Sequence, residues 1–328
     1  MIKSVFFVSV VSFTIALIII PWLIKYLKRI ELFVIDQNKE DKPLIPISGG
    51  IAVAAGILVS FMTLVFVKTF FQQLTPDLYI SIFAVLVSLL TVTFIGFIDD
   101  VLIKKSRDSS YGLKQWQKPL LTIFAAIPLI AVKLGVTKIY IPFFGSHDVG
   151  LLYPMVLVPL GFIGATNMVN LLAGFNGSEA GMGLVYTGML GLYAFLNGSY
   201  VASALAFSTF SALLVFFYYN KYPAKILPGD SLTYLLGAVI ACIAIVGNME
   251  KAALIASIPF IIEFILKARS KFKAQSYGFY KDGRVQSKYE KIYSIPHILT
   301  RTGKFTEKQV SLFMIGIELF FASLIWIV

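Results

Sequence analysis

The sequence has few of the residues on which soluble enzymes and metalloproteins commonly depend. Cys242 is the only cysteine among 328 residues, so no intrachain disulfide can form. Two histidines, His147 and His297, are too few for a multi-histidine metal site, and the sequence has no P-loop, zinc-protease helix or Rossmann glycine fingerprint. Charged residues make up only 14% of the chain, which is low for a soluble domain.

Hydrophobic residues instead make up 58% of the chain, and the mean hydropathy is +0.84. They form continuous apolar blocks close to the roughly 20 residues that a helix needs to cross a bilayer, without the alternation of barrel strands. The first block is too long for a removable signal peptide. The sequence therefore predicts an all-α integral membrane protein, with residues 1–328 as one polytopic domain. The ten predicted spans are 5–26, 49–71, 78–98, 119–134, 151–168, 180–196, 201–219, 231–247, 252–267 and 309–328.

Basic residues predict the orientation of these spans. With the amino terminus outside, the cytoplasmic segments carry 23 of the 28 Lys and Arg residues, and this bias follows the positive-inside rule. Ten spans then place both termini outside. The net charge of +11 is interpreted as topology determinants that face anionic lipid, with a subset free to bind phosphate, rather than as a nucleic-acid surface.

Acidic and amide side chains gather on one side of the predicted bundle. Buried polar groups are costly in lipid, so their distribution is informative. The predicted topology brings them all to the cytoplasmic boundary, and this convergence indicates an active site. The residues concerned are Asp99, Asp100, Asn167, Asn170, Asn176, Glu179, Asp230 and His297.

Each of these features also has a purely structural explanation. Asp99 and Asp100 could be solvated at a helix end, and the glycines of 167–183 could form a plain interhelical turn. Asp230 could be a helix N-cap, an alternative that only geometry separates from metal binding. Amide and carboxylate oxygens also suit Mg²⁺, which takes one or two protein carboxylates and completes its shell with water and phosphate.

Four motifs resemble those of the polyprenyl-phosphate N-acetylhexosamine-1-phosphate transferases. The second of them, in the form NxxNxxAGxNGxEAG, resembles the archaeal and eukaryotic dolichyl-phosphate branch of that superfamily, as does DKPLIPISGG at 41–50. The family architecture of ten spans with both ends outside implies that the resemblance covers nearly the whole chain. The motifs are IGFIDDVL at 95–102, NMVNLLAGFNGSEAG at 167–181, PGDSLTYLLGA at 228–238 and PHIL at 296–299.

The resemblance implies a role for each motif residue. Asn170 and Asp230 correspond to Mg²⁺ ligands, with Mn²⁺ as a substitute, and Lys118 corresponds to a lysine that binds the pyrophosphate. Asn176 would contact the uracil, and His297, which corresponds to the histidine of the last cytoplasmic loop, is expected to be catalytic. The remaining expected site residues are Asp99 and Asp100 as the catalytic acidic pair, and Asn167, Glu179 and Arg301 as substrate contacts.

The resemblance also implies the reaction. GlcNAc-1-phosphate passes from UDP-GlcNAc to a polyprenyl, and specifically dolichyl, phosphate, UMP is released, and lipid-linked glycan synthesis for protein N-glycosylation begins. The expected location is the plasma membrane, or the endoplasmic reticulum in a eukaryote, with membrane lipid and no nucleic acid as partners. A homodimer is left open. The residues beside His297 depart from the family pattern, so another UDP-amino sugar remains an alternative, and a secondary transporter is the rival outside enzymology.

Overall fold

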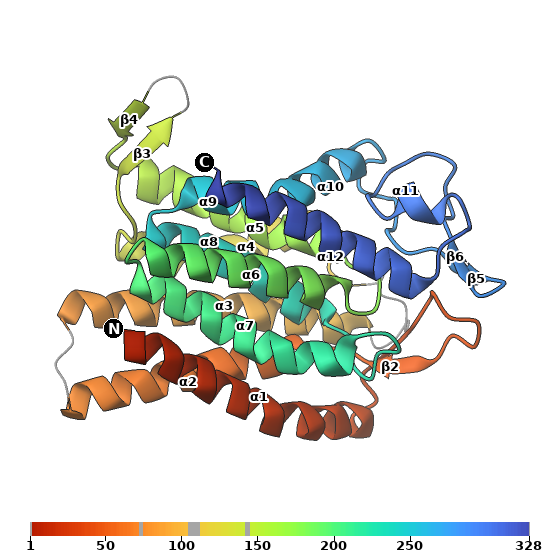
Figure 1. Ribbon diagram of the computed structural model, residues 1–328, viewed down its shortest axis with the longest axis horizontal. Coiled ribbons are helices and arrows are strands. Elements are labelled where there is room, and N and C mark those ends of the chain that lie inside the picture. Colours follow the sequence, from red (N-terminus) through yellow and green to blue (C-terminus); the bar gives the residue numbers. More distant parts are fainter. Residues whose placement is uncertain (1, 72–74, 104–111, 142–144, 328) are drawn as a thin grey trace.

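The protein is a bundle of roughly parallel helices with small hairpins at its two ends (Figure 1). The computed structural model describes residues 2–71, 75–103, 112–141 and 145–327, with the side chains of Tyr140, Ile141 and Ser146 excepted. Three basic residues of the predicted cytoplasmic loops, Lys104, Lys105 and Arg107, lie outside the described residues.

Helices account for most of the described chain. The α-helices are α1 (Ile2–Arg29), α2 (Gly50–Phe71), α3 (Pro76–Ile103), α4 (Gln117–Ala131), α5 (Val158–Leu171), α6 (Ser178–Leu196), α7 (Tyr200–Asn220), α8 (Gly229–Gly247), α9 (Glu250–Ala256), α10 (Ile258–Ala268), α11 (His297–Thr300) and α12 (Glu307–Ser323). The π-helix η1 (Tyr153–Leu157) precedes α5, and the 3₁₀-helix η2 (Leu324–Trp326) follows α12. Three two-stranded antiparallel hairpins pair β1 (Phe33–Ile35) with β2 (Leu44–Pro46), β3 (Lys138–Ile141) with β4 (Gly145–Asp148), and β5 (Phe279–Lys281) with β6 (Arg284–Gln286).

Seven helical segments of the described residues are long and apolar enough to cross a membrane. The prediction of a predominantly α-helical integral membrane protein is therefore confirmed. The other three predicted spans correspond to α4, which is shorter, to α6, and to the pair α9 and α10. The seven segments are α1, α2, α3, η1 with α5, α7, α8, and α12 with η2.

The ninth predicted span, 252–267, is a broken helix. Helix α9 ends at Ala256 and α10 begins at Ile258, with Pro259 in the first turn of α10. Proline has no backbone N–H to continue the ladder, and its ring clashes with the preceding turn. Pro259 therefore accounts for the break that divides this segment into two short helices.

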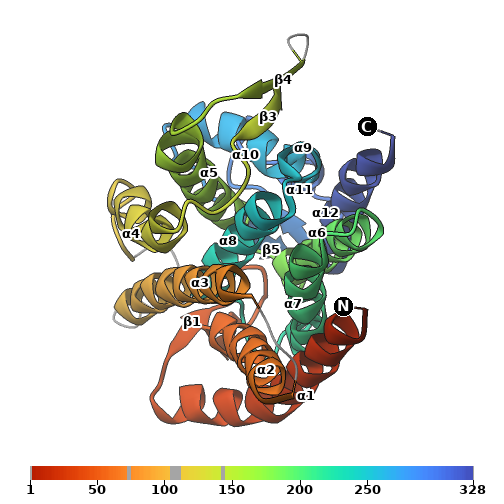
Figure 2. The ribbon, with the colours of Figure 1, turned by 90° about the vertical axis from the view of Figure 1, so that its left-hand side faces the viewer.

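Helix α8 lies at the centre of the bundle, as the view along the helices shows (Figure 2). Its most apolar window is 83% buried, against 28% for α1, because helices α2, α3, α5 and α7 all pack against it. Close approach depends on glycines: a Cβ added at Gly237 would lie 2.3 Å from the Ala165 backbone oxygen of α5. The amino-terminal end of this central helix therefore holds a fixed position for the polar groups around it.

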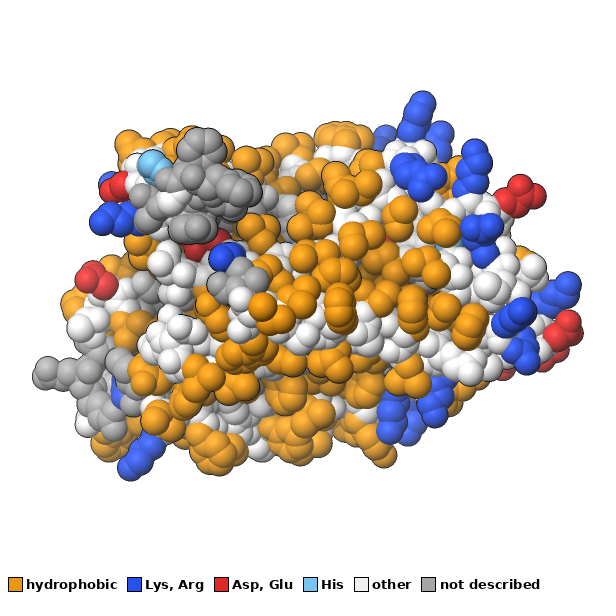
Figure 3. All heavy atoms as spheres, turned by 45° about the horizontal axis from the view of Figure 1, so that its top comes forward, with side chains coloured by type: hydrophobic (Ala, Val, Ile, Leu, Met, Phe, Trp, Pro, Cys, Tyr) orange, Lys and Arg blue, Asp and Glu red, His pale blue; other side chains and the backbone are white. Residues whose placement is uncertain are grey.

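The two ends of the bundle differ in charge. Lys and Arg side chains gather at the end that carries β5, β6 and α11, while apolar side chains cover the middle (Figure 3). Both chain termini lie toward the opposite end of the bundle, which is also the end that carries β3 and β4 (Figure 1). The loops that contain the predicted site residues all belong to the basic end.

Candidate active site

Asp99 and Asp100 lie inside helix α3 rather than at its solvated end. The helix continues to Ile103, beyond the predicted limit at residue 98, and both side chains are fully buried. The alternative of a solvated acidic pair is therefore wrong. Consecutive helical positions point about 100° apart, so the two carboxylates face different neighbours.

Asp100 holds the amino-terminal end of α8. Its Oδ1 accepts the Asp230 backbone N–H at 2.7 Å, and its Oδ2 accepts the Ser48 hydroxyl at 2.6 Å and the Ser231 N–H at 3.3 Å. A carboxylate there satisfies helix N–H groups that have no intrahelical partner and complements the helix dipole. Gly229 has a φ of +70°, and a Cβ on it would lie 2.3 Å from Asp100 Oδ2, so glycine is required there.

Asp99 faces Lys118 at the start of α4. The Lys118 Nζ lies 2.7 Å from Asp99 Oδ2 and 2.7 Å from Asp230 Oδ2, so one ammonium joins two carboxylates from α3 and α8. The other oxygen of Asp99 accepts the Leu113 backbone N–H at 2.6 Å. Two buried like charges are costly unless a cation lies between them, and Lys118 supplies that cation.

Asn170, at the end of α5, completes this group. Its Nδ2 donates to Asp230 Oδ2 at 3.2 Å, and its Oδ1 accepts the Thr233 hydroxyl at 2.9 Å. The Asp230 side chain makes no capping bond at the start of α8, so the N-cap alternative is wrong. Asp99, Lys118, Asn170 and Asp230 are called the acidic centre below. Four helices supply one residue each to it.

The acidic centre has the donor chemistry of a magnesium site. Mg²⁺ takes oxygen ligands and needs only one or two protein carboxylates. Asp99 Oδ2 is buried and pairs with Lys118 Nζ at 2.7 Å, so this oxygen lies beside Asp230 in the same centre. The Asn170 amide would present its oxygen after a flip of its two terminal atoms, because the Thr233 hydroxyl can accept as well as donate. The side chains present therefore fit the ion.

Two other predicted site residues shape the loop between α5 and α6. Glu179 accepts the Gly174 backbone N–H at 2.8 Å and the Ser178 hydroxyl at 2.7 Å, so its carboxylate closes that loop. Asn167 donates to the Thr122 hydroxyl at 3.1 Å and thereby links α5 to α4. Neither belongs to the acidic centre.

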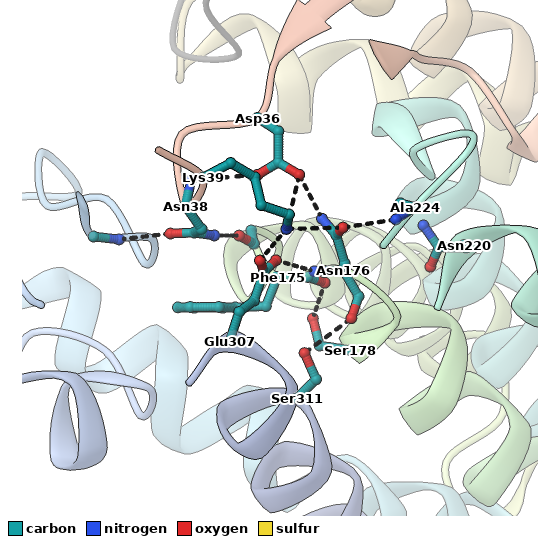
Figure 4. Close-up of polar contacts among 12 residues, drawn as sticks. Asp36, Asn38, Lys39, Phe175, Asn176, Ser178, Asn220, Ala224, Glu307 and Ser311 are labelled. Carbon is teal, nitrogen blue, oxygen red and sulfur yellow. Dashed lines mark hydrogen bonds and ion pairs between the residues drawn. The ribbon is translucent and has the colours of Figure 1, made fainter. Parts of the chain in front are cut away.

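Asn176 belongs to a second polar group, which the close-up shows between the α5–α6 loop, the β1–β2 loop and the start of α12 (Figure 4). Its Nδ2 donates to Asp36 Oδ2 at 3.0 Å, and its Oδ1 accepts Lys39 Nζ at 3.2 Å and the Ala224 backbone N–H at 2.9 Å. Glu307 accepts the Asn176 backbone N–H at 2.8 Å and pairs with Lys39. Asp36, Lys39, Asn176 and Glu307 are called the Asn176 network below.

Three of these four residues are not among the site residues predicted from the sequence. Asp36 and Lys39 lie three residues apart in the β1–β2 loop, whereas Glu307 lies 268 positions beyond Lys39 at the start of α12. A Thr306–Gln309 capping pattern predicts the start of α12, but it does not predict the direction of the Glu307 side chain. Three-dimensional contact alone groups them.

His297 lies in a third group, in the loop between α10 and α12. Its Nδ1 accepts the Tyr293 backbone N–H at 3.2 Å, which places the ring proton on Nε2, 3.0 Å from the Gln275 carbonyl oxygen. The ring is fully buried and stacks on Tyr289, and burial lowers its pKa to about 4. Both nitrogens therefore bind the loop itself, while Arg301, one turn further on, is exposed.

Glu263 and Lys267 form an ion pair within α10, with 3.7 Å between Lys267 Nζ and Glu263 Oε1. It also anchors the His297 loop. Glu263 accepts the Ser294 hydroxyl at 2.6 Å and the Ile295 backbone N–H at 2.8 Å. These contacts fix the loop against the broken helix.

The fold and these polar groups define an integral membrane protein whose buried acid–lysine centre lies at one end of a helical bundle. The chain belongs to glycosyl transferase family 4, whose model matches residues 82–248 and so includes every residue of the acidic centre. The family resemblance of the motifs is thereby confirmed.

Two archaeal proteins are similar over almost the whole chain. A putative UDP-N-acetylglucosamine–dolichyl-phosphate N-acetylglucosaminephosphotransferase of Saccharolobus solfataricus is 35% identical, over 95% of this chain and 92% of the relative. A protein of the same description from Sulfolobus acidocaldarius is 35% identical, over 96% and 93%. A phospho-N-acetylmuramoyl-pentapeptide-transferase of Shouchella clausii is 34% identical, over 79% and 80%.

Proposed function

We propose that the protein transfers GlcNAc-1-phosphate from UDP-GlcNAc to a polyprenyl phosphate, with dolichyl phosphate as the natural acceptor. An oxygen of the acceptor phosphate attacks the β-phosphorus of the donor. The bond from that phosphorus to the bridging oxygen breaks, UMP leaves, and polyprenyl-diphosphate-GlcNAc remains. The names and coverage of the archaeal relatives support both the donor and the acceptor.

The observation that carries the proposal is the position of Lys118 between two buried carboxylates of different helices. Phosphoryl transfer needs mainly positioning and neutralisation of charge on phosphate oxygens. Lys118 lies at the start of α4, so its ammonium can bind the donor diphosphate while it remains beside Asp99 and Asp230. A lysine of one helix that is held by carboxylates of two others is suited to bind and neutralise phosphate oxygens.

The two aspartates of α3 have different roles in this proposal. Both oxygens of Asp100 already accept hydrogen bonds from Ser48 and from α8, so Asp100 positions α8. Asp99 Oδ2 is the carboxylate oxygen that can face the acceptor phosphate, where it orients the nucleophile or removes its remaining proton. A phosphate monoester has a second pKa near 6, so little proton transfer is needed at neutral pH. Neither aspartate becomes phosphorylated.

Asp230 and Asn170, with Asp99 beside them, would hold Mg²⁺, and Mn²⁺ would replace it. The bound ion would neutralise charge on the diphosphate. In this chain the residues that bind the ion are fixed by the packing of α3, α5 and α8 and by the hydrogen bond from Thr233 to Asn170.

The remaining predicted residues would bind or frame the nucleotide sugar. Asn176 would donate to a uracil carbonyl, because among the described residues only one of its two Nδ2 hydrogens has an acceptor, Asp36. Glu179 and Asn167 would hold the loops around the donor. His297 would act by fixing its loop, and the exposed Arg301 would reach the phosphates from that loop.

Ten membrane crossings, with both termini outside, accommodate this site on the cytoplasmic side. The concentration of Lys and Arg at the end of the bundle that carries the site supports that orientation (Figure 3). The seven long helices would then be joined in the bilayer by α4, α6 and the broken pair α9 and α10. The protein would act at the plasma membrane.

UMP release tests the proposal directly. The purified protein, with Mg²⁺, UDP-GlcNAc and dolichyl or undecaprenyl phosphate, should release UMP, and Asp230→Ala should abolish the release. Asp77→Ala is the matched control, because Asp77 is an exposed carboxylate in the first turn of α3. No UMP from any UDP-amino sugar would disprove the assignment.

The bacterial relatives give a specific reason to test a second donor. A phospho-N-acetylmuramoyl-pentapeptide-transferase is 34% identical, so UDP-N-acetylmuramoyl-pentapeptide belongs in the same assay. A transporter would place its polar residues near the bilayer midplane. Here the acidic centre and the Asn176 network lie at one end of the bundle, which favours the enzyme.

A further inference from the structure

Glu307 is a buried carboxylate at the start of α12 that is not required to cap that helix. Only 3% of the residue is exposed. Thr306 and Gln309 already form a complete capping box: the Thr306 side chain accepts the Gln309 N–H, and the Gln309 side chain accepts the Thr306 N–H. The Glu307 carboxylate is therefore free of capping and points into the Asn176 network (Figure 4).

Helix α12 holds the Asn176 backbone from both sides. Glu307 Oε1 accepts the Asn176 N–H at 2.8 Å, and one turn further the Ser311 hydroxyl donates to the Asn176 carbonyl oxygen at 2.9 Å. Because both backbone groups are held, rotation of the peptide units beside Asn176 would break a buried hydrogen bond. Such a break is costly away from water.

The Asn176 side chain is oriented by the same network. Lys39 Nζ and the Ala224 N–H both donate to Oδ1, and Asp36 accepts from Nδ2, so the amide has one orientation that satisfies all three contacts. Lys39 is in turn held between Asp36, at 3.2 Å, and Glu307. Glu307 therefore fixes both the Asn176 backbone and the cation that orients its amide.

The charges of the network show what the loss of Glu307 would change. Two buried carboxylates share one ammonium, and a Lys39–Asp36 pair would remain without Glu307. Lys39 would then have no partner on α12, and the Asn176 N–H would have no acceptor there. The loop between Asn170 and Glu179 would lose its connection to α12 at Glu307, while the acidic centre would keep all of its contacts.

We propose that Glu307 is a positioning residue for the nucleotide end of the donor, acting through Asn176 and Lys39. The inference rests on the proposed function, in which Asn176 donates to the uracil. It assigns to α12 a part in donor binding and none in the chemical step. Loss of Glu307 should therefore weaken donor binding and leave the reaction of bound substrates largely intact.

Steady-state kinetics of UMP release test this assignment. Glu307→Ala removes a charge-assisted hydrogen bond and an ion pair, so the KM for UDP-GlcNAc should rise about tenfold or more. The KM for the polyprenyl phosphate and kcat should change by less than about threefold, because they depend on the acidic centre. Competitive inhibition by UMP should weaken by the same factor as donor binding. Glu290→Ala, which removes an exposed carboxylate, should change none of these values.

Glu307→Gln separates positioning from folding. Glutamine keeps an acceptor for the Asn176 N–H but loses the charge that holds Lys39, so the donor KM should lie between those of wild type and Glu307→Ala. A purely structural role would lower the melting temperature and the active fraction without this graded donor effect. An unchanged donor KM in both variants, or equal rises for both substrates, would overturn the inference. Absence of UMP release by the wild type would instead overturn the proposed function.

Discussion

Gly96 on α3 sets the distance between Asp99 on α3 and Asp230 on α8, so its replacement by alanine should disturb the acidic centre. A Cβ at Gly96 would lie 2.4 Å from the Asp230 carbonyl oxygen and 2.6 Å from Ser231 Cα. Both are backbone atoms of the first turn of α8, so no side-chain rotation relieves the clash. Asp99 follows Gly96 by one turn of the same helix, so the strain falls on the site.

The size of the displacement follows from these contacts. Ordinary contact with a Cβ begins near 3.4 Å, so Gly96→Ala must move α3 and α8 apart by about 1 Å. Lys118 Nζ lies 2.7 Å from both Asp99 and Asp230, and it cannot keep both contacts across a wider gap. A misplacement of about 1 Å in a catalytic site costs roughly 100-fold in rate. Overpacking also costs about 1–3 kcal/mol of stability.

The measurement is the initial rate of UMP release at saturating substrates, on protein shown to be monodisperse by size exclusion. We expect Gly96→Ala to lose roughly 100-fold in kcat. Gly161→Ala on α5 is the control, because no described atom lies within 4 Å of the added Cβ. It should match the wild type in rate and melting temperature.

A folded Gly96→Ala protein with the wild-type kcat would refute this reasoning. That result would mean that α3 and α8 tolerate separation without loss of alignment between Asp99 and Asp230. An equal loss in Gly161→Ala would also count against it, since added volume anywhere in the bundle would then be enough.

Three further perturbations separate the roles of neighbouring groups. Asp99→Asn should abolish UMP release with little change in melting temperature. Asp100→Asn should instead destabilise the protein by about 1–3 kcal/mol, because it weakens the buried hydrogen bonds to α8. Equal melting temperatures for the two variants would contradict these separate roles. Lys118→Met should abolish UMP release, and it leaves the Asp99 and Asp230 carboxylates together without a cation. Added Mg²⁺ should therefore raise the melting temperature of this variant more than that of the wild type. An equal or smaller rise would argue against the cation site. The pKa of His297 is lowered to about 4 from an unfolded value near 6.5, so between these pH values the unfolded state binds more protons than the folded state. Wild-type stability should therefore be lost as the pH falls from about 6.5 to 4. His297→Gln should lose less stability over this range in thermal melts, and parallel curves for the two proteins would exclude His297 as the cause.

Hydropathy was sufficient to predict the helices and their approximate limits, because a lipid-facing helix must be apolar along its whole length. It placed the end of α3 too early, since Asp99 and Asp100 interrupt the apolar run although the helix continues. The ninth segment was predicted as one span, but Pro259 interrupts its hydrogen-bond ladder and the chain forms two short helices there. The short hairpins β1–β2 and β5–β6 were not predicted, because three-residue strands in charged loops have no marked period.

The site was predicted only as far as its motifs extend. Asp99, Asn170 and Asp230 belong to three of the four motifs, Lys118 was matched by the family resemblance outside them, and the structure brings all four together. Glu307 belongs to none, and it meets Asn176 across 131 positions of the chain. Contacts of that separation depend on how the helices pack, which no local pattern in a single sequence encodes.

The carboxylate of Asp100 has a consequence for how phosphate can be bound. Many proteins receive phosphate on the exposed N–H groups at the start of a helix, where the helix dipole attracts an anion. Here the Asp230 and Ser231 N–H groups at the start of α8 are already bonded to an anion that the protein itself supplies. These two N–H groups are therefore not free to receive phosphate, and in the proposed function the diphosphate would be bound by Lys118 and a dissociable ion instead. A site that binds its substrate through a lysine and a dissociable ion, rather than through backbone N–H groups, can release a charged product without rearranging its backbone.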